Sequence, residues 1–409
     1  MLRVTDPRGA NSNFIYNARH LVSGITYLNQ PGLGPEPAGI SPAPPVSFSY
    51  DSAGNRASMT DGAGSVGYQY DTWSRLTSET RTFNDLSGSY PLTYEYNLAG
   101  RLKKLTDPFG AAVNYFYNDA GQLTSVTGSG FPNVSQFASS TEYRAWGGVK
   151  RCSYGNNANL NISYNTRLLM TRFELGNSGS DYQYYDDGRV KFASNFLNNA
   201  FDRKYVYDHV GRLTQGLTGS EARADAGALG PYKQVYQYDS FDNLTSRTNR
   251  FWTQSDDGYT ATYVNDRNIA WNYDSAGNIK DDTMSHTYDV VSRQTNAHDI
   301  TTNIDQSYDG DSRAAKRVEN RAGYISTIYY LRSSVLGGKP VTELNTAGIN
   351  SGTHKTHVYV NGSELALYDS WFNLVLWRLS NPVTGSGWQE RPAWRVCWFR
   401  GPLPGKPRV

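Results

Sequence analysis

A short motif that recurs along most of the chain is the feature that most restricts its fold. Each copy has a tyrosine, then Asp or Asn, two variable residues, a position often occupied by Gly, and a polar residue that opens an alternating run. Clear copies are YDSAGNRA from Tyr50, YDTWSRLT from Tyr70, YNLAGRLK from Tyr96, YNDAGQLT from Tyr117, YDHVGRLT from Tyr207, YDSFDNLT from Tyr238, YDSAGNIK from Tyr273, YDVVSRQT from Tyr288 and YDGDSRAA from Tyr308. Weaker copies begin at Tyr16, Tyr143, Tyr164 and Tyr185. Many neighbours start 20 to 22 residues apart, a period typical of repeat architectures built from supersecondary units.

The residue types in the motif predict a β-hairpin. The tyrosine usually follows another aromatic residue by two positions, as Tyr70 follows Tyr68, which places both rings on one face of a strand. The Asp or Asn side chain can accept a hydrogen bond from the backbone two residues further on and so start a turn. Glycine tolerates a positive φ at the fifth position, where it occurs as Gly54, Gly100, Gly121, Gly211 and Gly277. Each copy is therefore expected to be strand, turn, strand.

A single hairpin is marginally stable in water, so the units must stack side by side. The 31 tyrosines and 39 glycines suit pleated strands and turns, and no segment longer than two helical turns has a convincing apolar stripe. We therefore predict an all-β fold. Consecutive antiparallel β-hairpins should stack into one curled, spiralling sheet that holds more than half of the residues.

Charge and cysteine content exclude several classes of function. The 39 basic residues nearly cancel the 37 acidic ones, whereas a nucleic-acid-binding protein usually carries a basic excess. No apolar run approaches the ~18–20 residues of a membrane-spanning helix. Cys152 and Cys397 do not have zinc-ligand spacing, and we interpret the scattered histidines as solvent-facing strand residues. The histidines are His20, His209, His286, His298, His354 and His357. We expect no metal and no cofactor.

The repeated carboxylates are predicted to be structural and not catalytic. Asp occupies the second motif position in seven clear copies, but Asn97, Asn118 and Asn165 stand at the same position in others. A general acid or a nucleophile would not survive this exchange, whereas a turn-starting acceptor would. The residues predicted to form the turn are Tyr50, Asp51, Gly54, Tyr70, Asp71, Tyr96, Gly100, Tyr117, Gly121, Tyr207, Asp208, Gly211, Tyr238, Asp239, Tyr273, Asp274, Gly277, Tyr288, Asp289, Tyr308 and Asp309.

The motif at this period resembles the YD repeats of Rhs proteins, of the shell components of insecticidal toxin complexes and of teneurins. A second stretch, YDGDSRAAKRVEN from Tyr308 followed by ISTIYYLRSSVLGGKPVTELN from Ile325, resembles the run that leads into the Rhs-associated core. HVYVNGSELALYD from His357 and WRLSNPVTGSG from Trp377 continue this resemblance. Asn381-Pro382-Val383-Thr384-Gly385 is similar to the family's Asp-Pro-x-x-Gly element, with Asn in place of Asp. The likeness covers roughly residues 5–387.

The resemblance implies part of a hollow YD shell. We expect residues 1–320 to form the hairpin array, 321–387 to be similar to the Rhs-associated core, and 388–409 to be a basic Pro-, Trp- and Arg-rich disordered tail. The implied function is a non-enzymatic scaffold, the C-terminal wall of a shell that encloses or presents a toxin or effector. Its partners would be the rest of a larger Rhs polypeptide or the toxin cargo, and its location would be secreted or at the bacterial surface.

Two alternatives remain open from the sequence. Rows of exposed tyrosines could bind carbohydrate or a cell-surface receptor, because flat rings suit the apolar faces of sugars. Some members of the resembling family also cleave themselves after the core with the help of acidic residues. Here Glu364 and Asp369 are the nearest candidates, and Glu390 is the one acidic residue beyond Asp369. We expect no self-cleavage.

Overall fold

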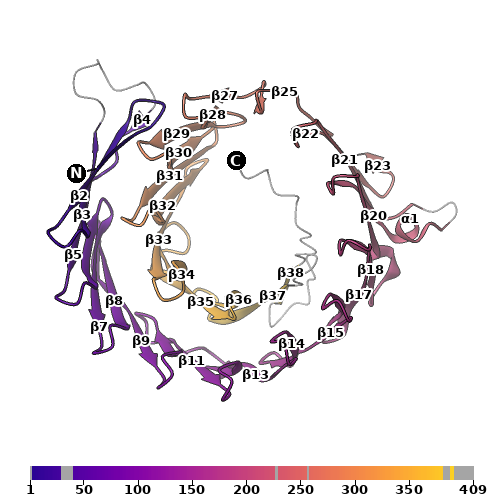
Figure 1. Cartoon of the computed structure of the whole chain (residues 1–409), viewed down its shortest axis with the longest axis horizontal. Coiled ribbons are helices and arrows are strands. Elements are labelled where there is room, and N and C mark those ends of the chain that lie inside the picture. Colours follow the sequence, from indigo (N-terminus) through magenta and orange to yellow (C-terminus); the bar gives the residue numbers. More distant parts are fainter. Residues whose placement is uncertain (1, 29–39, 226–228, 256–257, 381–386, 391–409) are drawn as a thin grey trace.

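The protein folds into a curled, nearly all-β spiral (Figure 1). The computed structural model describes residues 2–28, 40–225, 229–255, 258–380 and 387–390. Strands account for 60% of the structure and helices for 2%, which confirms the predicted fold class. No helix among these residues is long and apolar enough to cross a membrane.

A 23-stranded antiparallel sheet, here called the outer wall, forms the large ring in Figure 1. Consecutive strands pair along the chain, as the hairpin repeat predicts. Its strands are β1 (Leu2–Thr5), β2 (Asn11–Tyr16), β3 (Val22–Leu28), β5 (Val46–Tyr50), β6 (Arg56–Asp61), β7 (Gly64–Tyr70), β8 (Leu76–Phe83), β9 (Leu86–Tyr96), β10 (Leu102–Thr106), β11 (Ala112–Tyr117), β12 (Leu123–Ser129), β13 (Gln136–Tyr143), β14 (Val149–Tyr154), β15 (Asn159–Tyr164), β16 (Met170–Leu175), β17 (Ser178–Tyr184), β18 (Val190–Asn195), β19 (Arg203–Tyr207), β20 (Leu213–Thr218), β21 (Tyr232–Tyr238), β22 (Leu244–Phe251), β23 (Gln254–Ser255) and β24 (Tyr259–Thr260). The helical elements are η1 (Asn199–Phe201) and α1 (Gly219–Arg223).

A second, 13-stranded sheet, here called the inner wall, continues the spiral inside the ring (Figure 1). Its strands are β27 (Asn272–Tyr273), β28 (Ile279–Asp281), β29 (Ser285–Asp289), β30 (Gln294–His298), β31 (Thr302–Tyr308), β32 (Ala314–Arg321), β33 (Tyr324–Ser333), β34 (Lys339–Ala347), β35 (Thr353–Val360), β36 (Ser363–Asp369), β37 (Leu374–Ser380) and β38 (Gly387–Glu390), together with β4 (Ile40–Ser41). β4 comes from the N-terminal part of the chain and pairs with β29 in parallel. It therefore attaches the start of the spiral to its second turn.

The expectation of one continuous sheet is wrong at residues 261–271. There the chain forms only β25 (Tyr263–Val264) and β26 (Arg267–Asn268), a two-stranded hairpin that pairs with neither wall. Because β25 and β26 pair only with each other, no ladder of hydrogen bonds joins the outer wall to the inner wall along the chain at these residues. The long spacing between the copies at Tyr238 and Tyr273 thus contains the break between the two walls.

The second turn of the spiral gives the sheet its core. Val126 and Phe137 of the outer wall are buried in one apolar cluster with Val341, Val358 and Trp377 of the inner wall. A smaller cluster joins Phe83 to residues of β33, and another packs Ala10 and Ile40 against Val290. Burial of apolar surface is the main favourable term in folding. The two walls therefore stabilise each other, because each wall covers an apolar face of the other sheet.

Candidate functional site: the repeated turn and the seam between the walls

The Asp or Asn at the second motif position closes each turn through its side chain. In the copy at Asp51, the Asn55 backbone N–H donates to Asp51 Oδ1 at 2.8 Å, and Gly54 N–H donates to the Asp51 carbonyl at 3.1 Å. Hydrogen bonds from Asn55 hold the pKa of the Asp51 carboxyl below its ordinary value. The backbone N–H four residues on donates equally to the side-chain oxygen of Asp71, Asp208, Asp239, Asp274, Asp289, Asp309, Asn97, Asn118 and Asn165. Only a carbonyl-type oxygen is required, which explains the exchange of Asp for Asn.

The fifth motif position has a left-handed backbone whether or not it is glycine. Gly54, Gly100, Gly121, Gly211 and Gly277 have φ values of 92°, 77°, 73°, 99° and 89°. Ser74 and Ser292 stand at the same position with φ of 58° and 62°. The turn therefore imposes the conformation, and glycine is the residue that adopts it without strain.

The motif copy predicted to begin at Tyr185 begins one residue earlier in the structure. Tyr185 N–H donates to Arg189 O, as the motif Asp does, and Gly188 has φ of 90°. Tyr184 is thus the motif tyrosine. Two adjacent tyrosines made the register ambiguous, and the position of Gly188 is the signal that resolves it.

The motif tyrosines tie successive hairpins together, a role that the sequence reading missed. Tyr117 Oη donates to the carbonyl of Leu102, and Tyr70 Oη donates to that of Arg56. In each case the acceptor is the seventh residue of the preceding copy. The same bond is made by Tyr50, Tyr96, Tyr143, Tyr164, Tyr184, Tyr238 and Tyr308. Tyr273 instead accepts from Asn268 N–H, while Tyr207 and Tyr288 make ring contacts with Tyr185 and His286.

Arginine at the sixth motif position brackets two neighbouring turns. Arg212 Nε donates to Asp208 Oδ2 in its own turn at 2.7 Å, and its Nη1 donates to the Asp239 carbonyl of the next turn at 2.8 Å. Its guanidinium carbon also lies 5.0 Å from the centroid of the Tyr238 ring. Arg75 and Arg293 stack on the next motif tyrosine in the same way. The motif therefore specifies contacts between hairpins as well as the turn within each one.

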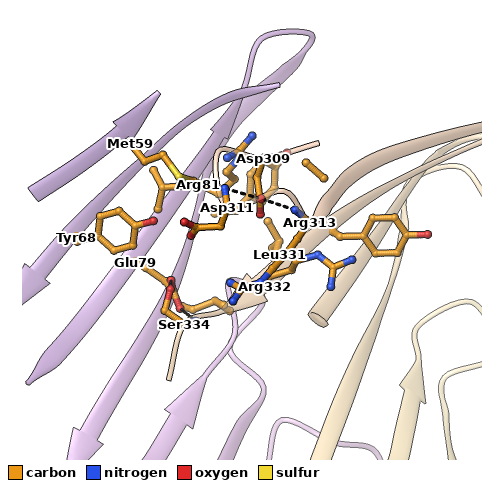
Figure 2. A pocket seen from close by; sticks show the side chains of 15 residues that line it. Met59, Tyr68, Glu79, Arg81, Asp309, Asp311, Arg313, Leu331, Arg332 and Ser334 are labelled. Atoms are coloured by element: carbon orange, nitrogen blue, oxygen red, sulfur yellow. Dashed lines mark hydrogen bonds between the residues drawn. The ribbon is translucent and has the colours of Figure 1, made fainter. Parts of the chain in front are cut away.

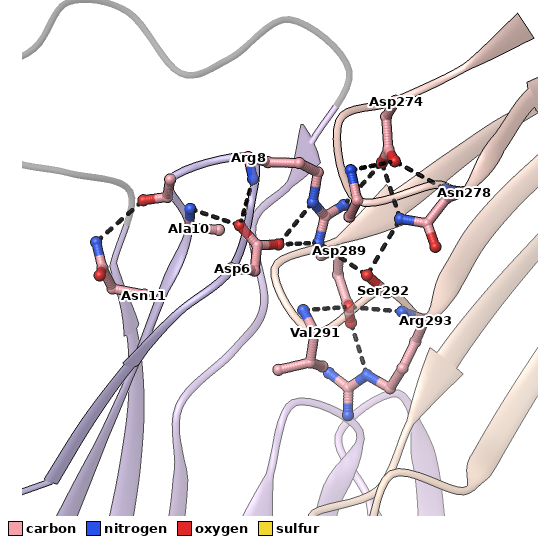
Figure 3. Close-up of polar contacts among 12 residues, drawn as sticks. Asp6, Arg8, Ala10, Asn11, Asp274, Asn278, Asp289, Val291, Ser292 and Arg293 are labelled. Carbon is pink, nitrogen blue, oxygen red and sulfur yellow. Dashed lines mark hydrogen bonds and ion pairs between the residues drawn. The ribbon is translucent and has the colours of Figure 1, made fainter. Parts of the chain in front are cut away.

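The seam between the walls begins at Arg8, in the turn that joins β1 to β2 (Figure 3). The Arg8 side chain is only 3% exposed and pairs with Asp6 and Asp274. Its Nη2 donates to the Asp289 carbonyl at 2.9 Å and to Ser292 Oγ at 3.1 Å. A buried guanidinium needs this number of partners because an unpaired one would be costly. Asp274 and Asp289, predicted as turn residues, thus also bind Arg8 at the start of the outer wall.

A small polar cavity lies further along the seam, between β6–β9 and β32–β33 (Figure 2). Arg81 forms a two-point ion pair with buried Asp61 at 2.7 Å, and Asp61 also accepts from Gly310 N–H at 3.0 Å. Glu79 accepts from the Ser334 N–H and hydroxyl at 2.8 and 2.7 Å. The volume of about 40 Å³ has room for a few water molecules. The cavity is therefore a polar joint between the walls and too small for an organic substrate.

Burial changes the protonation behaviour of the carboxyls in this joint. Desolvation raises the pKa of Glu79 although Tyr94 and Ser334 donate to it, and desolvation raises the pKa of Asp309 as well. Arg56 pairs with Asp311 at 2.9 Å across the same seam. Asp309, a predicted turn residue, is the one motif carboxylate in the cavity lining.

The interpretation of the histidines as solvent-facing is wrong for His357, and His286 and His354 are half-buried as well. His357 is 7% exposed on β35, with its Nδ1 2.6 Å from Glu364 Oε1 and its Nε2 3.4 Å from Glu343 Oε1. Arg378 of β37 donates to the other Glu364 oxygen at 2.6 Å. Burial alone would lower the pKa of His357, but the hydrogen bonds and charges of Glu343 and Glu364 raise it above its ordinary value. These four residues form a charge ladder across β34 to β37.

The remaining candidate groups occupy separate environments. His354 stacks on Phe109 with ring centroids 3.8 Å apart, and burial lowers its pKa. His286 contacts Asp282 at 3.1 Å, and His20, His209 and His298 are exposed. Cys152 is buried with a free thiol, whereas Cys397 lies outside the described residues. Within the described ranges, no group of three or more His, Cys, Asp or Glu side chains could hold a metal ion.

The two acidic residues considered for self-cleavage, Glu364 and Asp369, lie in different environments. Glu364 belongs to the charge ladder, where desolvation is outweighed by His357 and Arg378, so its pKa is lowered. Asp369 is 5% exposed at the end of β36 and accepts from Trp371 N–H at 3.0 Å. The segment 391–409 lies outside the described residues.

Comparisons with known proteins agree with the repeat and the fold. The RHS Repeat family model matches residues 50–84 and 92–130, which contain β6–β8 and β10–β12. No curated protein sequence matches the chain. Among solved structures, TcdB2-TccC3-TEV is similar with a TM-score of 0.76 at 15% identity, over 95% of this chain and 22% of that one. The Tc holotoxin pore of Photorhabdus luminescens, with a substituted TccC3, is similar with a TM-score of 0.75 at 15% identity over the same shares.

A spiral of antiparallel hairpins, many of them closed by one recurring tyrosine–aspartate or tyrosine–asparagine turn, defines a repeat-built β-scaffold. Residues 50–84 and 92–130 match the RHS Repeat family, and the same turn recurs in the copies outside these residues. It spans only 22% of the length of the Tc toxin chains that share its fold.

Proposed function

We propose that the chain is a non-enzymatic wall segment of a YD-repeat shell, which encloses or presents a C-terminal toxin or effector. The observation that carries this proposal is the use of every predicted motif carboxylate as a backbone acceptor in a turn. A carboxylate held by two or more backbone or arginine donors is a structural group and is not free to act as a general base.

Similarity of fold to TcdB2-TccC3 supports a place within a larger toxin-related assembly. Its partners would be the rest of a larger Rhs polypeptide or the enclosed cargo, at a secreted or cell-surface location. The division at residues 320 and 387 stays a prediction. The inner wall runs across the first of these positions without a break, since β32 pairs with β33 from Lys316 to Arg321.

The structure favours this function over carbohydrate binding by the motif tyrosines. Their hydroxyls donate to neighbouring hairpins, and arginines cover several of their rings. A sugar-stacking platform needs an exposed ring face. The tyrosine rows are instead used for packing between hairpins.

Intact mass measured after incubation at neutral pH tests the absence of self-cleavage. An uncut chain is expected, because Glu364 is paired with His357 and Arg378, and Asp369 caps its own turn. A discrete cut between residues 370 and 390 that Asp369→Asn or Glu364→Gln abolishes would overturn the scaffold proposal. Electron microscopy of the same sample should show open, hollow rings.

A further inference from the structure

Two acidic side chains, one from each wall, lie in the cavity of the seam (Figure 2). Glu79 of β8 is 4% exposed, and Asp309, in the turn between β31 and β32, is 9% exposed. The turn of Asp309 packs closely on the outer wall, because a Cβ added to Gly310 would lie 2.6 Å from Val46 Cγ1 and 2.8 Å from Met59 Sδ. Closing the seam therefore removes both carboxyl groups from water.

Glu79 is held by neutral donors. Its Oε1 accepts from the Tyr94 hydroxyl and from the Ser334 N–H, and its Oε2 lies 2.7 Å from Ser334 Oγ. None of these donors carries a charge, whereas a buried carboxylate is costly without a counter-charge. A protonated Glu79 fits the same contacts, because its own O–H can donate to Ser334 Oγ. The surroundings of Glu79 thus suit a neutral carboxyl group.

Asp309 lacks the arginine contact that other motif aspartates have. At Asp208 and Asp289, Nε of the sixth-position arginine donates to the second carboxylate oxygen at 2.7 and 2.6 Å. Asp309 accepts instead from two backbone N–H groups of its own turn, at 3.0 and 2.8 Å. Arg313 stands at the sixth position here, but its guanidinium lies against Gly338 and forms no such bond in the described part of the chain. Asp309 is thus buried without the ion pair that neutralises its counterparts.

The charged groups around the two carboxyls come from both walls. The titratable and charged side chains that line the cavity or act on its carboxyls are Asp61, Arg56, Tyr68, Arg81, Tyr90 and Tyr94 of the outer wall, and Asp311, Arg313, Tyr330 and Arg332 of the inner wall. Arg81 pairs with Asp61, and Arg332 donates to the carbonyls of Ala314 and Gly338. Of the cations in the cavity lining, this leaves Arg313. A single positive charge cannot neutralise two carboxylates.

We propose that the seam is a pH-dependent latch, which holds the second turn of the spiral against the first when Glu79 and Asp309 are protonated and loosens when they ionise. Desolvation raises the pKa of both carboxyls, so the closed seam binds more protons than the open one. The stability that the seam provides is therefore full at low pH. It begins to fall as pH rises through the ordinary pKa values of 3.8 and 4.5, and the loss is complete above the raised values.

Hydrogen–deuterium exchange of the intact chain tests the latch at two amides that cross the seam. Ser334 N–H donates to Glu79 and Gly310 N–H donates to Asp61, so both exchange when the seam opens. After correction for the intrinsic effect of pH on exchange, their protection should be at least about tenfold lower at about pH 7.5 than at about pH 4. Peptides from β21 and β22, which lie away from the seam (Figure 1), should show no such loss.

The double variant Glu79→Gln, Asp309→Asn makes the latch insensitive to pH and keeps its contacts. Glutamine has the same acceptor oxygen and can donate to Ser334 Oγ, and asparagine closes the motif turn in the copy at Asn97. The pH-dependent loss of protection should shrink to less than about threefold. Asp208→Asn is the matched control, because it makes the same change in a motif turn outside the seam, where an arginine pairs with the aspartate. It should leave the pH dependence of the seam amides unchanged.

Two results would overturn the latch. One is protection of the seam amides that does not depend on pH in the unchanged chain. The other is a pH dependence that survives in full in the double variant, because other groups of the joint would then be responsible. If circular dichroism shows that the double variant has lost strand structure, Glu79→Gln alone decides the question. It should remove part of the pH dependence, and an unchanged dependence would count against the latch.

Discussion

The hairpin ladder of residues 50–130 and the seam between the walls use similar residue types in opposite ways. In the ladder, Tyr117 reaches Leu102 and Arg75 reaches Asn97, so each contact crosses one hairpin and repeats with the motif. In the seam, Arg8 reaches Asp289 and Glu79 reaches Ser334, across 281 and 255 residues, and each contact occurs once. The ladder therefore specifies how hairpins stack, while the seam specifies where the second turn of the spiral meets the first.

This difference predicts that substitutions in the seam are more damaging than substitutions in the ladder. Ladder contacts are repeated, mostly part-exposed and close in sequence. Seam contacts join charges removed from water, so their loss leaves a partner unpaired. Four substitutions test this comparison, from the largest expected effect to the smallest.

Arg81→Met should have the largest effect. It leaves the Asp61 carboxylate, whose side chain is 1% exposed, without its two-point partner in the outer wall, and Asp61 is the group that accepts from Gly310 N–H across the seam at 3.0 Å. Removing one member of a buried ion pair costs about 3–5 kcal/mol of unfolding free energy. Arg172→Met is the matched control, because its pair with Asp181 is exposed on both sides and such pairs contribute about 0–1 kcal/mol. If urea denaturation shows equal losses of unfolding free energy for the two variants, substitutions in the seam are no more damaging than substitutions elsewhere in the wall.

Gly100→Ala tests the ladder turn without any steric clash. No atom lies within 4 Å of the position that a Cβ would occupy at Gly100, and φ is 77°. The cost is therefore backbone strain alone, about 1–2 kcal/mol. The reverse change, Ser74→Gly, relieves φ of 58° and should be neutral or stabilising. Gly211→Val, at φ of 99° and with Arg189 Nη1 3.1 Å from the added Cβ, should cost at least as much; a loss within about 0.5 kcal/mol would contradict the turn assignment.

Tyr117→Phe tests the bond between hairpins. It removes the hydroxyl that donates to Leu102 O at 2.8 Å and leaves the ring in place. The expected loss is about 0.5–1.5 kcal/mol, the net value of one hydrogen bond. Tyr324→Phe, at a tyrosine that is 74% exposed, should change stability very little. If both substitutions are silent, the hydroxyl ladder does not stabilise the wall.

The ladder could be predicted from the sequence because its contacts are local and repeated. The exchange of Asp51 for Asn97 and Asn118 at one motif position already indicated a backbone acceptor. The Tyr117–Leu102 bond belongs to a pattern that repeats in nine copies, because the acceptor is each time the seventh motif residue of the preceding copy. The seam could not be predicted. Nothing near Arg8 or Glu79 in the sequence marks either residue as buried, because their partners follow from the radius of the spiral and not from the motif.

Substitution in the charge ladder of the inner wall should have the smallest effect on stability. The charge ladder should also make stability depend on pH with a defined sign. The raised pKa of His357 contributes stability that is present below its ordinary pKa of about 6.5 and is lost as pH rises through the raised value. Glu343 and Glu364 have lowered pKa values, so their contribution is present above about 4.5 and is lost as pH falls through those values. The melting temperature should therefore be highest in the mildly acidic range. His357→Gln should flatten the alkaline side of that profile, whereas His298→Gln, at an exposed histidine, should leave it unchanged. If the melting temperature of the His357 variant depends on pH as that of the unchanged protein does, the charge ladder does not couple protonation to the stability of the inner wall.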